Sequence, residues 1–134
     1  MYDILKFNSA KRTIYTALSL ISIIWIVELV NLLMNHKLVE FGIYPRTLNG
    51  LIGIPLSPLI HGSIWHAISN TLPIFILSVF MLIVQKHHFW LITALIIIFS
   101  GGLVWIFSRN SFHIGASGLV FGYFGAIIMH AGIL

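Results

Sequence analysis

Residues 113–125, HIGASGLVFGYFG, place one small hydroxyl, Ser117, between Gly115 and Gly118. This stretch lies where a polar turn gives way to an apolar segment, at the predicted start of a helix. No bulky side chain flanks the serine, so another helix or a substrate backbone can approach its oxygen, and glycine permits the turn before the helix. Taken alone, the pattern favours a helix whose small residues serve close packing.

The composition excludes a soluble domain. Of 134 residues, 59% are hydrophobic and 7% charged, whereas soluble chains carry about a quarter charged residues. Such a chain cannot cover a surface that faces water, which indicates an integral membrane protein with one domain. The sequence has no cysteine, so disulfides and thiolate metal sites are excluded. The net charge of +4 comes from scattered residues and indicates membrane topology rather than nucleic-acid binding.

Four apolar runs predict membrane-spanning helices at about residues 14–34, 63–84, 89–107 and 115–134. The first run has 21 residues, enough at ~1.5 Å per residue to cross a hydrocarbon core of ~30 Å. Residues 36–60 form a loop that is too apolar for a solvated linker. We expect this loop to fold as a structured element, partly embedded in the membrane.

The basic residues predict the orientation, because cytoplasmic loops carry an excess of Lys and Arg. With the N-terminus inside, four basic residues are cytoplasmic and three are outside. The cytoplasmic set is Lys6, Lys11, Arg12 and Lys86, and the outer set is Lys37, Arg46 and Arg109. The long loop and Ser117 then both lie toward the outer face.

A second polar stretch, HGSIWHAISN at residues 61–70, opens the second span. His66 and Asn70 are four residues apart and share a helix face, and His61 lies about one turn earlier. Polar side chains at membrane depth are costly unless they face protein or water. Three interpretations remain open: oxyanion donors for attack by Ser117, a metal site formed with His113, or polar contacts between helices. The histidine spacing and the lack of acidic ligands fit the metal site less well.

The two motifs together, H-x4-H-x3-N followed by G-x-S-G, resemble the rhomboid family of intramembrane serine proteases. The stretch YPRTLNGLIGIPLSPLIHGSIWHAISNTLP, residues 44–73, is similar to the first loop and second helix of bacterial rhomboids. HIGASGLVFGYFG is similar to their catalytic-serine helix. The resemblance extends from about residue 44 to residue 134, and implies an all-α polytopic membrane protein with a rhomboid-like helical bundle.

The resemblance also implies roles for individual residues. Ser117 matches the nucleophile, and His61 and Asn70 match the side chains that stabilise the oxyanion. His66 matches a histidine that packs behind the site. Supporting positions are Gly115, Gly118 and Phe121, where many members have tyrosine. No cofactor and no metal are implied.

The family's general base is a histidine on a sixth helix, and four of the usual six helices are predicted here. His130 lies 13 residues after Ser117, ~20 Å along the helix axis, and cannot reach it. A stripe formed by Gly118, Gly122 and Ala126 lacks a matching partner helix, so self-association through it is possible. We therefore expect a fragment or truncated product of a longer rhomboid protein.

The expected function is hydrolysis of peptide bonds in transmembrane protein substrates near the outer membrane face. The alternative is a catalytically inactive rhomboid-like protein that binds membrane helices, because the histidine helix is absent. The expected location is the bacterial cytoplasmic membrane, with several spans, contact with lipid and no nucleic-acid partner.

Overall fold

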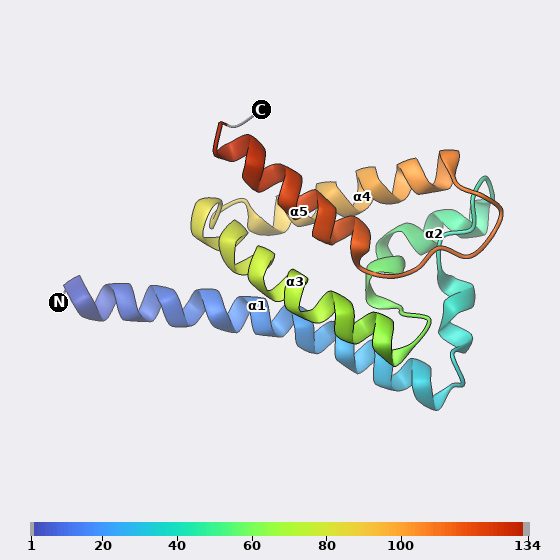
Figure 1. The fold of residues 1–134 in the computed structure, drawn as a ribbon, viewed down its shortest axis with the longest axis horizontal. Coiled ribbons are helices and arrows are strands. Elements are labelled where there is room, and N and C mark those ends of the chain that lie inside the picture. The colour runs from blue at the N-terminus through green and yellow to red at the C-terminus, as the bar shows by residue number, and fades with distance from the viewer. Residues whose placement is uncertain (1, 133–134) are drawn as a thin grey trace.

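The computed structural model describes residues 2–132 and is all-helical, with no strand in that range. The elements follow one another as α1 (Tyr2–Leu33), η1 (Lys37–Phe41), α2 (Leu48–Leu56), η2 (Ser57–Leu59), α3 (Ile64–Val84), α4 (Phe89–Phe107) and α5 (Ser117–His130). α3 lies between α1 and α5, and α4 packs on the other side of α5 (Figure 1). The predicted all-α fold class is confirmed.

In the part of the chain that the structure describes, three helices are long and apolar enough to cross a membrane: Ser9–Leu33, Ile64–Val84 and Phe89–Phe107. α5 differs from the predicted span at 115–134, because it has 14 residues, or ~21 Å at ~1.5 Å per residue. It begins only at Ser117, since Gly115 adopts a left-handed φ of +103°. It ends at His130, shortly before Gly132, whose φ is +70°. Residues 133–134 lie outside the described range.

The core joins α1, α3, α4 and α5 through a small number of fully buried side chains. Tyr123 of α5 is the largest, and its hydroxyl lies 2.7 Å from the Thr93 hydroxyl of α4. Its ring stacks on Phe89 at 5.9 Å. Many large apolar side chains on the outer helix faces are exposed, as suits a protein surrounded by lipid rather than water. The hydroxyl pair stabilises the α4–α5 contact without leaving a buried polar group unpaired.

The loop between α1 and α3 folds into η1, α2 and η2 and packs on α4 (Figure 1). Thr47 caps α2 by accepting a hydrogen bond from the Gly50 N–H at 3.1 Å. The Trp105 indole donates to the Thr47 carbonyl at 2.9 Å. Arg46 donates to the Ile106 carbonyl at 2.9 Å and to the Asn110 side chain. These bonds fix the loop to the end of α4 that leads toward Ser117.

The basic side chains separate into two groups at opposite ends of the helices. Lys86, in the turn between α3 and α4, donates to the Ser9 hydroxyl of α1 at 3.3 Å. Arg12 lines a cavity with Lys86 at this end. Arg46 and Arg109 lie at the other end, beside the start of the segment that carries Ser117. The structure thus separates these basic residues into the same two groups as the topology prediction does.

Candidate active site

Ser117 is the first residue of α5, and the segment before it is fixed at two points. His113 forms an antiparallel bridge with Ile43, with N–H to O distances of 2.8 and 3.0 Å. The Gly115 N–H then donates to the Ser57 carbonyl at 2.8 Å. The serine itself is exposed, and its hydroxyl makes no hydrogen bond within residues 2–132. The loop 36–60 therefore positions a serine whose oxygen is open to a substrate.

His66 brings the start of α3 to the turn before Ser117. A Cβ added at Gly115 would lie 2.6 Å from Cε1 and 2.8 Å from Nε2 of the His66 ring. The ring therefore packs directly on the glycine, which agrees with a histidine behind the site. On its other side, His66 meets the ring of His61 edge-on, with centroids 5.0 Å apart.

His61 is buried, with 0% of its surface exposed. Neither of its ring nitrogens makes a hydrogen bond in the described part of the chain. Burial, and then the neighbouring His66, lowers its pKa from 6.5 to about 4. The nearby Leu59 backbone opposes this lowering of the pKa, without forming a hydrogen bond to either ring nitrogen of His61. At neutral pH the ring is therefore uncharged, with one N–H available as a donor.

Asn70 lies one turn after His66 on α3 and is 9% exposed. Its amide nitrogen donates to the His66 carbonyl of the same helix at 3.1 Å. An amide group carries two N–H donors, so one remains after this bond. Neither Asn70 nor His61 is hydrogen-bonded to Ser117. Asn70 thus lies on α3 and His61 just before its start, while the His66 ring packs on Gly115 in the turn that carries the serine.

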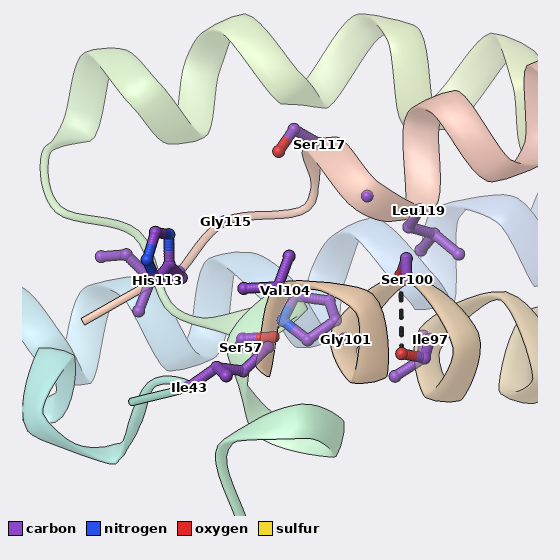
Figure 2. A pocket seen from close by; sticks show the side chains of 13 residues that line it. Ile43, Ser57, Ile97, Ser100, Gly101, Val104, His113, Gly115, Ser117 and Leu119 are labelled. Carbon is purple, nitrogen blue, oxygen red and sulfur yellow. Dashed lines mark hydrogen bonds between the residues drawn. The ribbon is translucent and has the colours of Figure 1, made fainter. Parts of the chain in front are cut away.

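A cavity of about 130 Å³ lies beside Ser117, enough for several water molecules. Figure 2 shows Ser117 at the start of α5, with Gly115 and His113 on the segment leading to it. Ser57 of η2 and Ser100 of α4 also line this cavity. Sequence reasoning missed both serines, because isolated serines in apolar runs carry no motif. Ser57 acts through its backbone carbonyl, which any residue could supply.

No histidine ring in residues 2–132 is hydrogen-bonded to the Ser117 hydroxyl. His113 lines the same cavity, and its Nε2 lies 3.0 Å from the Arg109 carbonyl and 3.3 Å from the Ser111 hydroxyl. The loop therefore orients this ring, although the sequence offered no group to do so. His130 pairs with Gln85 at 3.0 Å near the far end of α5, in agreement with its predicted distance from Ser117.

The small-residue stripe on α5 faces α4 at two of its three positions. A Cβ at Gly118 would lie 3.0 Å from the Ser100 hydroxyl, and one at Gly122 would clash with Ile96. The sequence predicts no partner helix with matching small residues. In the structure α4 packs against both glycines, with Ser100 at Gly118 and the larger Ile96 at Gly122. Phe121, on the same side of α5, is 74% exposed. It lines an apolar groove of about 410 Å³ between α4 and α5.

A metal site finds no support among the described residues, which contain no group of three or more His, Cys, Asp or Glu side chains suited to hold an ion. His61 and His66 are adjacent but have no third ligand. Their edge-on packing is typical of neighbouring aromatic rings.

Comparison with known proteins gives one family. Residues 49–132 match the Rhomboid domain. An uncharacterized protein of Mycobacterium leprae is 31% identical over 120 residues, which are 85% of this chain and 48% of that protein. Uncharacterized proteins of Mycobacterium bovis and Mycobacterium tuberculosis are each 32% identical over 120 residues, 85% of this chain and 50% of theirs. The chain thus spans about half the length of these relatives, and no solved structure matches it. The domain match covers more than half of the sequence, and this chain belongs to the rhomboid family.

Proposed function

We propose that this chain carries the nucleophile and the oxyanion-binding groups of an intramembrane serine endopeptidase. Its substrates are transmembrane proteins, cut near the outer face of a bacterial cytoplasmic membrane. The main supporting observation is the unbonded hydroxyl of Ser117, at the start of a helix and beside a cavity large enough for water. A serine used only for helix packing would be covered, whereas Ser117 is exposed.

In the proposed reaction the Ser117 oxygen attacks the carbonyl carbon of the scissile peptide bond. The carbonyl oxygen becomes an oxyanion, which needs preorganised donors. The first N–H groups of α5 have no partner within the helix, since its first backbone bond runs from the Val120 N–H to the Ala116 carbonyl. Asn70 of α3 and His61, which lies three residues before this helix, supply side-chain donors. When the intermediate collapses, the C–N bond breaks and the amine leaves with the proton taken from the serine, which gives an acyl-enzyme. Water from the cavity then hydrolyses its ester bond, which releases the new carboxylate and restores the Ser117 hydroxyl.

The reaction also needs a base that removes the proton of the serine hydroxyl, because a neutral serine is a weak nucleophile. In the rhomboid family, which this chain resembles, this base lies on a helix after the spans matched here. We assign it to a histidine of the whole protein outside the present sequence. His113 is the described alternative, because it lines the same cavity as Ser117.

The test is labelling of the whole protein in membranes with a serine-directed fluorophosphonate, followed by cleavage of a model transmembrane substrate. Ser117→Ala should abolish both signals. Ser100→Ala is the matched control, since this serine lines the same cavity and should leave labelling intact. A folded protein that neither labels at Ser117 nor cleaves would exclude the enzymatic function.

The second candidate is a catalytically inactive protein that binds membrane helices. The open groove between α4 and α5, with its exposed Phe121, favours this function. Photocrosslinking from position 121 separates the two candidates. Capture of a helix by a protein that does not react at Ser117 would support binding without catalysis. Self-association through Gly118, Gly122 and Ala126 is less favoured, because α4 already packs against the two glycines.

A further inference from the structure

The end of the molecule opposite Ser117 contains a cationic cavity. It lies between α1 and the turn from α3 to α4, and has a volume of about 350 Å³. Arg12 and Lys86 line it together with His87, the hydroxyl-bearing Thr13 and Thr16, and the ring of Trp90. Trp90 is 56% exposed. Tryptophan with basic residues at a helix end is typical of the level of lipid headgroups.

Among the side chains that the structure describes, no acidic group lines this cavity or lies beside it. The acidic side chains that the structure describes are Glu28 and Glu40, one near the C-terminal end of α1 and the other in η1. Both lie at the opposite end of the molecule. Lys86 bonds only to a neutral hydroxyl, that of Ser9, among the contacts described. A ligand that fits the cavity must therefore bring negative charge.

An apolar groove of about 500 Å³ adjoins the cavity and runs between α1 and α3. The cavity and the groove share three lining residues, Thr13, Leu82 and Lys86. The groove is otherwise lined mainly by aliphatic side chains, including Ile14, Val79 and Ile83. One side of Lys86 thus faces a basic pocket, and the other faces a hydrocarbon surface.

We propose that these two hollows form one binding site for an anionic phospholipid. The phosphate of the lipid binds Arg12 and Lys86, and an acyl chain lies in the groove between α1 and α3. Lys86 is long enough to place its aliphatic stem along the chain while its ammonium group meets the phosphate. A soluble phosphate would use the cavity and leave the groove empty. Because basic residues mark the cytoplasmic side, the lipid belongs to the inner leaflet.

The site joins elements that are distant in the sequence, since α1 meets the turn that connects α3 and α4. The side-chain hydrogen bond that the structure gives between these two elements runs from Lys86 to Ser9. A lipid bound in the site adds a second link between them and so stabilises their contact. This proposal is independent of the chemistry at Ser117, which lies at the other end of α5. An inactive protein would bind the same lipid.

The experiment uses the full chain in phosphatidylcholine vesicles, with increasing fractions of phosphatidylglycerol brominated on its acyl chains. Bromine quenches tryptophan fluorescence at short range, and the difference between the native chain and Trp90→Phe isolates the signal of Trp90. We expect half-maximal quenching of Trp90 at a membrane fraction of brominated phosphatidylglycerol at least about fivefold lower than the fraction of brominated phosphatidylcholine that gives the same quenching. The reason is that one basic residue near the membrane surface contributes ~1 kcal/mol to the binding of an anionic lipid.

Lys86→Gln and Arg12→Gln should each reduce this preference by roughly fivefold, and Lys86→Arg should retain it. Lys37→Gln removes the same charge from the opposite end and should change nothing. Equal quenching by the two lipids, or an equal effect of Lys37→Gln, would overturn the site. Release of the quenching by millimolar glycerol phosphate would overturn the lipid as ligand, because it would show recognition of the phosphate alone.

Discussion

The imidazole ring of His66 lies directly on the backbone of Gly115, so close that a Cβ at Gly115 would come within 2.6 Å of Cε1. This contact connects α3 to the turn that precedes Ser117, with His61 packed behind it. The motif residues are therefore organised around one glycine. Its left-handed φ of +103° and the adjacent ring both oppose any side chain at this position.

Gly115→Ala should destabilise the protein and displace Ser117. The left-handed backbone alone costs about 1–3 kcal/mol for a residue with a side chain, and the contact with His66 adds to this. Unfolding in increasing SDS, followed by circular dichroism, measures the change. The control is Gly125→Ala, where a Cβ meets nothing within 4 Å and the helix should gain about 0.5–1 kcal/mol. Equal effects at the two positions would contradict the packing described here.

Gly101→Leu should detach α2 from α4. A Cβ at Gly101 would lie 2.7 Å from Cγ2 of Ile54, so a larger side chain leaves no room for the helix. Limited proteolysis within residues 48–59 should become at least several times faster. Gly102→Leu is the matched control, because a Cβ at the adjacent glycine meets nothing within 4 Å. Unchanged proteolysis of the Gly101 variant would show that α2 is held by other contacts.

Asn31→Leu should loosen the connection between α1 and the loop that holds His61. The Asn31 side chain donates to the His61 carbonyl at 2.8 Å and accepts from the Leu38 N–H at 3.1 Å, and it is fully buried. Leaving these backbone groups unpaired should cost about 1–3 kcal/mol for each group. Hydrogen exchange at the Leu38 amide and SDS unfolding report the loss. Ser22→Ala, at an exposed position of α1, should leave both unchanged.

Stability should fall as the pH is lowered from about 6.5 toward about 4, because the pKa of His61 is lowered to about 4 in the folded protein. In this window the unfolded chain takes up a proton at His61 and the folded chain does not, so protonation favours unfolding. Above pH 6.5 the residue has no effect on the pH dependence. His61→Gln, which cannot titrate, should make the free energy of unfolding depend less on pH between about 6.5 and about 4. An unchanged slope in this variant would show that His61 is not responsible.

The sequence by itself determined the class of the protein and supplied the candidates for its site residues. Long apolar runs with few charges predicted the helices later found as α1, α3 and α4, because backbone groups in lipid must be satisfied within a helix. The positions of Ser117, His61 and Asn70 followed from two motifs. Within residues 2–132, neither His61 nor Asn70 is hydrogen-bonded to the serine, and their roles in oxyanion binding are part of the proposed function.

Only the tertiary structure decided how these pieces meet. The Ser57 carbonyl holds Gly115, and α4 packs on Gly118 and Gly122. Such contacts join backbone or small groups that are far apart along the chain, and they leave no periodic signal in the sequence. The same holds for the basic cavity, where Arg12 and Lys86 are separated by 74 positions. Hydrophobic patterning fixes which segments enter the membrane, but packing of particular side chains fixes which segments become neighbours.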